Sequence, residues 1–190
     1  MASINGLSVN GLTRFAGHEG ETRYQGNLYL GTKKLGFWSQ DGWGGPDRYR
    51  LEGKYSERLL NEAVKRANPD KAEKFGDSEN GFVVEYDLDL LLNDFIVLQF
   101  DEKEFKKAVK AGYGGLVIAT DGYHVTAWKI PKSYAEMADE KLLETMAPYI
   151  DEAKADFFKE TGVTKHVVKI YRSLGDFAVG EPIAQKDIMV

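Results

Sequence analysis

The pattern that most constrains this fold is a period-two alternation of apolar and polar residues, which runs through much of Leu7 to Leu51. Before Gly31, for example, Leu28 and Leu30 fall on one side of an extended chain, and Asn27 falls on the other. A period of two is the repeat of a β-strand, and short strands joined by tight turns pair with their neighbours. The region therefore predicts an antiparallel β meander, with Gly31 to Lys34 as one hairpin turn.

Beyond this meander the apolar residues follow helical spacing. We expect about four helices: between Ser56 and Asn68, over Asp89 to Val97, from Asp101 through Val109, and from Lys141 to Lys159. Ser56 and Asp101 have side chains that commonly cap helix N-termini. Ser133 with Glu136 matches a capping box, and Pro148 is expected to kink or split the last helix.

The later strands are shorter. Asp121-Gly122 predicts a two-residue hairpin turn between Gly115 to Ala119 and Tyr123 to Ile130. Val163 to Tyr171 alternates again and predicts a C-terminal strand, whereas the tail beyond Phe177 is weakly patterned and is expected to form an extended arm. Strands grouped in runs indicate an α+β fold with mainly antiparallel sheets. We expect a single domain over residues 1–190, with an N-terminal β subdomain over residues 1–69 as the alternative.

Composition narrows the class of protein. The chain has 190 residues and no cysteine, which excludes a disulfide scaffold, a thiol nucleophile and a cysteine-ligated metal site. The N-terminus has no basic and apolar leader pattern, and the apolar run from Leu88 to Phe100 is too short and too polar to span a bilayer. These features predict a cytoplasmic protein without a membrane partner.

Charge is distributed unevenly along the chain. Residues 1–69 hold ten lysines and arginines against seven acidic residues, a net +3, whereas residues 70–190 hold fifteen against twenty-three, a net -8. Such asymmetry is typical either of a polyanion-binding region or of solvated acidic helices. Nucleic acid is therefore one candidate partner. An alternative hypothesis is that the protein is an acidic inhibitor of a nucleic-acid-binding protein, with residues 70–162 imitating the charge of a polyanion.

The most unusual segment is Phe37 to Arg48, which concentrates two of the three tryptophans with glycines and aspartates. Glycine permits close approach of the backbone to a ligand, and an exposed indole offers a surface for stacking. One interpretation is a site for an anionic, planar ligand such as a nucleotide; the other is a rigid hairpin whose tryptophans pack into a β core. The candidate ligand-binding residues are Trp38, Asp41, Trp43, Gly44, Gly45, Asp47, Arg48 and Arg50.

Catalytic patterns are weak in comparison. An EF-hand beginning at Asp41 would need oxygen ligands where Trp43 and Gly45 stand, and no zincin, Walker A or nucleophile-elbow sequence occurs. The alternative enzymatic hypothesis is a metal-dependent hydrolase or nuclease that uses His18, Glu19, Asp41 and Asp47. The identity of any cofactor is unknown from the sequence. The leading hypothesis is a non-enzymatic binding protein.

Three segments carry a resemblance to a group of known proteins. The strand, turn and strand of Tyr24 to Gly36, the loop Asp41 to Pro46 and the terminal run Val168 to Leu174 resemble small uncharacterised proteins of bacterial phages and plasmids. The resemblance implies a bacterial or phage source and an accessory role that acts on a host macromolecule or a nucleotide. It implies no defined active site.

Overall fold

The computed structural model describes residues 1–43, 45–75 and 82–189 of the chain. These residues form two compact units. The larger unit comprises Ala2–Leu98 and Ala178–Val190, and the smaller unit comprises Met1 and Gln99–Phe177. The boundaries of these units, at Leu98 and at Phe177, differ from the subdomain boundary at residue 69 considered from the sequence. A single domain over residues 1–190 stays a prediction.

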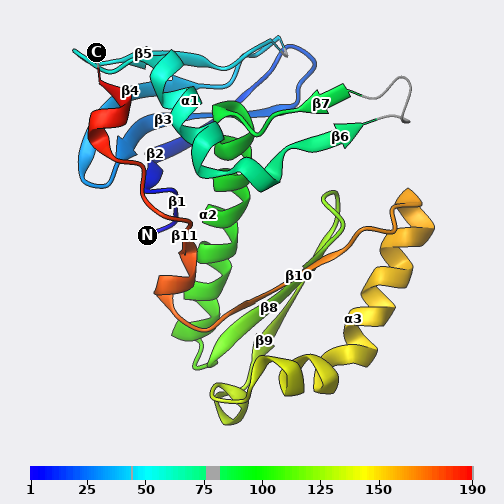
Figure 1. Ribbon diagram of the computed structural model, residues 1–190. Helices are drawn as coiled ribbons and strands as arrows, with labels where there is room; N and C mark the ends of the chain where they lie inside the picture. Colours follow the sequence, from blue (N-terminus) through cyan, green and yellow to red (C-terminus); the bar gives the residue numbers. More distant parts are fainter. Residues whose placement is uncertain (44, 76–81, 190) are drawn as a thin grey trace. The chain divides into compact units, whose positions relative to one another are not determined.

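A six-stranded sheet organises the larger unit (Figure 1). Its strands are β1 (Ser3–Ile4), β2 (Leu7–Ala16), β3 (Thr22–Leu30), β4 (Lys33–Ser39), β5 (Arg48–Leu51) and β11 (Ala178–Val179), in the order β11-β1-β2-β3-β4-β5. All neighbours are antiparallel except β1 and β11. The α+β class and the antiparallel sheet are thus confirmed. The prediction of an extended arm beyond Phe177 is wrong, because β11 joins the sheet and Ile183 and Ile188 are buried.

One face of this sheet is covered by apolar residues and helices. Helix α1 (Glu57–Ala67) begins after Ser56, whose hydroxyl accepts the Leu59 N–H, and buries Leu60, Ala63 and Val64. Helix α2 (Leu88–Lys110) begins in this unit, where the Tyr49 hydroxyl of β5 donates to Asp89. Strands β6 (Glu73–Phe75) and β7 (Phe82–Val84) form a separate two-stranded sheet. Tyr49 pairs with the buried Trp38 of β4, so α2 contacts the apolar side of these two strands.

The described residues contain three α-helices rather than about four. The two helices predicted over Asp89 to Val97 and from Asp101 are the single helix α2, so Asp101 is not an N-cap. Instead Asp101 is buried, and its carboxylate accepts the Tyr171 hydroxyl at 2.8 Å. A residue type that commonly caps helices is used here for a contact 70 positions away in the sequence.

The smaller unit contains the C-terminal part of α2, a three-stranded antiparallel sheet and one further helix. Strands β8 (Gly115–Thr120), β9 (Val125–Ile130) and β10 (Val167–Tyr171) lie in the order β10-β8-β9, and α3 (Asp139–Thr161) packs against them (Figure 1). Val117 and Ile130 of the sheet meet Leu142 and Ile150 of the helix in a buried cluster. Pro148 lies inside α3 without dividing it.

Two local predictions for this unit are wrong. The β8–β9 connection is four residues long, because the Asp121 carboxylate accepts the N–H groups of both Tyr123 and His124 and forms a wider turn. Ser133 does not cap a helix: it lies in a short 3-10 turn, and α3 begins later, after Ala138. Among the described residues, no helix has the length and apolar character needed to cross a membrane.

Candidate ligand-binding pocket

The Trp/Gly/Asp segment connects β4 to β5, and Gln40 fixes its start. The Gln40 N–H donates to the Tyr24 carbonyl, and the Gln40 side-chain oxygen accepts the Tyr24 N–H, both at 2.9 Å. The amide nitrogen of Gln40 donates to Asn93 of α2 at 2.8 Å. The loop therefore leaves the sheet from a residue whose backbone and side chain are both hydrogen-bonded.

Asp41 holds the loop in shape from within. One carboxylate oxygen accepts the N–H groups of Gly45 at 2.9 Å and Trp43 at 3.2 Å, and the other meets the Arg48 guanidinium at 2.6 Å. The Gly45 N–H, followed by the Trp43 N–H and Arg48, keeps the pKa of this carboxyl below its usual value although the residue is buried. Asp41 is thus ionised, and its carboxylate stabilises the turn by accepting these hydrogen bonds.

Trp43 projects from this turn. It is 73% exposed, and the His18 ring stacks on it with centroids 3.8 Å apart and planes 22° apart. The loop that carries His18 is joined to the Trp43 loop by the bond from the His18 N–H to the Gly42 carbonyl at 2.7 Å. An indole that is positioned by two neighbouring loops and still mostly exposed leaves apolar surface in contact with water.

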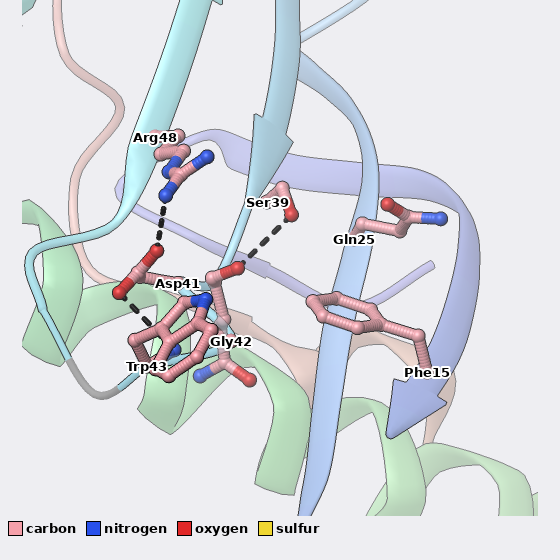
Figure 2. Close-up of a pocket in the computed structure, with 8 residues that line it drawn as sticks. Phe15, Gln25, Ser39, Asp41, Gly42, Trp43 and Arg48 are labelled. Atoms are coloured by element: carbon pink, nitrogen blue, oxygen red, sulfur yellow. Dashed lines mark hydrogen bonds and ion pairs between the residues drawn. The ribbon is translucent and has the colours of Figure 1, made fainter. Parts of the chain in front are cut away.

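A pocket of about 210 Å³ lies beside Trp43 (Figure 2). Phe15 of β2, Gln25 of β3 and Arg48 of β5 line it from the sheet. The rest of the lining comes from the end of β4 and the loop, namely Ser39, Gln40, Asp41, Gly42 and Trp43. The pocket therefore combines two aromatic rings with amide, hydroxyl and guanidinium groups.

The second tryptophan of the segment has a structural place. Trp38 is fully buried, and its indole N–H donates to Asp47 at 2.7 Å. The Asp47 N–H in turn donates to the Asp89 carboxylate at 3.2 Å. Burial raises the pKa of Asp47 to about 6, against the Trp38 hydrogen bond, which lowers it. Of the two interpretations of the segment, the structural one describes Trp38, whereas Trp43 is 73% exposed and does not pack into the β core.

The other predicted residues are distributed as follows. Gly45 lies in the loop and donates to Asp41, and Gly44 is outside the described residues. Arg50 lies on β5 opposite Phe37 and does not line the pocket. Asp41, Trp43 and Arg48 are thus brought together, and Trp38, Asp47 and Arg50 are not among the lining residues.

The residues of the enzymatic alternative have separate partners. Asp41 accepts N–H groups of its own loop and pairs with Arg48, and Asp47 accepts the Trp38 N–H. The His18 ring stacks on Trp43, and the backbone N–H of Glu19 donates to Glu21. Within the described part of the chain, no three histidine or acidic side chains form a group that could hold a metal ion. The hydrolase hypothesis and the acidic-inhibitor hypothesis stay predictions from the sequence.

The predicted site residues leave out five of the lining residues: Phe15, Gln25, Ser39, Gln40 and Gly42. The alternation of β3 already placed Gln25 on the polar side of its strand, and the register puts Ser39 of β4 directly opposite it. Extending that alternation across the meander would have indicated which side chains share a face with the loop. Phe15 required the pairing of β2 with β3, which no local pattern gives.

Comparisons of the chain with protein-family models, with curated proteins and with solved structures found no match. The resemblance to phage and plasmid proteins therefore stays a prediction, as does the identity of any partner.

Proposed function

We propose that the protein is a non-enzymatic binding protein whose pocket beside Trp43 takes the planar ring of an anionic ligand such as a nucleotide. The observation that carries the proposal is the 73% exposure of Trp43 in a loop that Asp41 holds in place. A mostly exposed indole in a fixed turn contributes little to the stability of the fold. It can contribute much to the binding of a planar ligand, because base–indole stacking is worth about 1–3 kcal/mol.

The size and chemistry of the pocket agree with this ligand class. Pockets for drug-sized molecules measure about 300–1,000 Å³, and the smaller volume here, about 210 Å³, suits one ring rather than a whole nucleotide. Gln25 and Ser39 offer amide and hydroxyl groups to the edge of that ring. The sugar and phosphate would extend toward solvent.

Arg48 supplies the contact for negative charge. Its side chain is 72% exposed although one nitrogen pairs with Asp41. A guanidinium has five N–H donors, so the remaining ones are available to a phosphate. Because Asp41 already neutralises much of this charge, we expect stacking to contribute more to affinity than the phosphate does. A phage or plasmid accessory role on a host nucleotide or macromolecule is part of the proposal and rests on the resemblance alone.

The test is calorimetric titration with AMP, with adenosine, which lacks the phosphate, and with ribose 5-phosphate, which lacks the base. We expect AMP to bind, adenosine to bind more weakly and ribose 5-phosphate to bind least. Trp43→Ala should weaken AMP binding about tenfold, the equivalent of ~1.4 kcal/mol of lost stacking. Trp43→Phe should retain most of the affinity.

The matched control is Tyr123→Ala, which removes another exposed aromatic side chain, 78% exposed, from the β8–β9 turn. It should leave AMP affinity unchanged. The proposal fails if folded Trp43→Ala protein binds AMP as the wild type does, or if the wild type does not bind AMP at millimolar concentration.

A further inference from the structure

The six-stranded sheet has two chemically different faces, and one of them continues the pocket. Along β3, Gly26, Leu28 and Leu30 are buried on the side of the apolar core. The alternate positions of the same strand are only half-buried, and side chains two apart on a strand project from the same face. These positions are Arg23, Gln25, Asn27 and Tyr29.

The strand register extends this second face across β2 to β5. Asn27 pairs with Phe37 of β4, which pairs with Arg50 of β5, and Phe15 of β2 pairs with Arg23. Directly paired residues project to the same side of a sheet. We call this surface the open face; its aromatic and basic members are Phe15, Arg23, Tyr29, Phe37, Arg48 and Arg50.

Aromatic rings and guanidinium groups are neighbours on the open face. Phe15 lies opposite Arg23 and Phe37 lies opposite Arg50, and such cross-strand pairs have Cβ atoms about 4.5–5.5 Å apart. Phe15 and Phe37 are half-buried, so part of each ring is in contact with water. Rings on which bases stack, placed beside cations that contact phosphates, are the combination by which sheets bind unpaired nucleic-acid strands.

The charge of this region fits a polyanion. Residues 1–69, which supply the open face, carry a net +3 in a chain whose total is -5. Arg23 is paired with Glu21 at 3.0 Å and Arg48 with Asp41 at 2.6 Å, so these two are partly neutralised. Arg50 is exposed, and Lys34 of β4, paired with Glu52, adds a further cation on the Tyr29 side.

The open face is also continuous with the Trp43 pocket, because Phe15 and Arg48 belong to both. From Arg23 to Tyr29 the face extends six residues along β3, a length of about 20 Å. That length accommodates two or three stacked bases, the number that the four-stranded sheets of some RNA-binding modules bind.

We propose that the open face binds single-stranded nucleic acid, with one base in the Trp43 pocket, further bases stacked on Phe15 and Phe37, and the backbone contacted by Arg48 and Arg50. The inference rests on the proposed function of the pocket and specifies its ligand as one unit of a strand. Duplex bases are stacked on each other and cannot stack on these side chains, so the surface selects unpaired strands.

The experiment is fluorescence anisotropy with labelled oligothymidylate of about twelve nucleotides, within the ~4–16 nucleotides that one such module covers. Oligouridylate of the same length and a duplex serve as the other probes. We expect both single strands to bind at least tenfold more tightly than the duplex. Equal binding of the two single strands assigns the contacts to bases and phosphates; tighter binding of oligouridylate adds a contact to the ribose hydroxyl.

Two variants outside the pocket separate this inference from the proposed function. Arg50→Ala should weaken oligothymidylate binding about three- to tenfold and reduce the slope of log affinity against log salt concentration by about 1, as loss of one phosphate contact does. Phe37→Ala should weaken it about tenfold. Neither should change AMP binding. Arg58→Ala, which removes an exposed arginine from α1, is the matched control and should bind normally.

The outcomes are distinct. If Arg50→Ala and Phe37→Ala protein bind oligothymidylate like the wild type, the open-face inference is wrong while the pocket stands. The open-face inference is also wrong if AMP binds but no oligonucleotide binds more tightly than AMP, or if the duplex binds as tightly as the single strands. If Trp43→Ala leaves AMP binding intact, the proposed function is wrong instead. Arg50 is exposed, so its variant keeps the test valid even if Phe37→Ala fails to fold.

Discussion

Replacing Asp47 with asparagine should stabilise the larger unit at neutral pH. The Asp47 carboxyl accepts the N–H of the buried Trp38, and the Asp47 backbone N–H donates to the Asp89 carboxylate. An asparagine amide keeps an oxygen for the Trp38 N–H and removes a negative charge from a partly buried place. Burial, reinforced by Asp89, raises the pKa of Asp47 from 3.8 to about 6, so its ionised form is unfavourable in the folded state.

The magnitude follows from the size of this pKa shift. At 1.36 kcal/mol per pKa unit, ionised Asp47 destabilises the fold by at most about 3 kcal/mol, less for its partial exposure. Because the folded pKa lies above the unfolded one, the favourable contribution of protonated Asp47 is complete below pH 3.8 and is lost as the pH rises through about 6. Asp47→Asn should therefore gain about 1 kcal/mol over the wild type at about pH 4.5 and up to ~3 kcal/mol at about pH 7.5.

The assay is urea unfolding at these two pH values, followed by tryptophan fluorescence. The chain has three tryptophans, so Trp43→Phe and Trp128→Phe make Trp38 the reporter of the larger unit. Asp70→Asn is the control, because it removes the same charge from an exposed position in the short turn Pro69–Lys71. An equal advantage of Asp47→Asn at both pH values, or a loss of stability at neutral pH, would refute the assignment of Asp47 as a partly buried, protonatable group.

Two further predictions concern packing. Trp38→Ala should destabilise the larger unit by about 3–5 kcal/mol because it empties a fully buried site. Trp43→Ala should change the free energy of unfolding by less than ~0.5 kcal/mol. Equal losses of stability in urea unfolding would contradict the different roles of the two tryptophans. Tyr171→Phe should cost the smaller unit about 1–3 kcal/mol, because the buried Asp101 carboxylate loses the hydroxyl donor at 2.8 Å; an unchanged midpoint in the Trp128 fluorescence transition would count against that contact.

Local patterns predicted those elements whose burial follows a simple period. The strands of the meander were recognisable because Leu28 and Leu30 alternate with polar residues, and α1 because Ser56 precedes apolar residues at helical spacing. Asp101 misled the prediction since a carboxylate before a polar turn resembles an N-cap, and its actual partner, Tyr171, is remote in sequence. Strand β11 has two residues and no pattern of its own, so only its pairing with β1 identifies it.

The candidate site was predictable in part for the same reason. The sequence singled out the loop because tryptophan and glycine are concentrated there, but it could not distinguish the two tryptophans. Trp38 is the last apolar residue in the alternation of β4 and pairs with Gly26 on the buried face, whereas Trp43 follows the end of the strand. The open face required the register of four strands at once, which is non-local information.

The parallel pairing of β1 with β11 has a consequence for how the chain folds. Ser3 pairs with Ala178, so the two partners are separated by 175 positions in the sequence. Closing so long a loop is entropically costly, and contacts of this range slow folding. During synthesis, β1 to β5 can pair as soon as they leave the ribosome, but the pairing of β1 with β11 must wait for nearly the whole chain. The last step in assembling this sheet is therefore the docking of its C-terminal strand, and refolding should show a slow phase that is absent from the pairing of the meander.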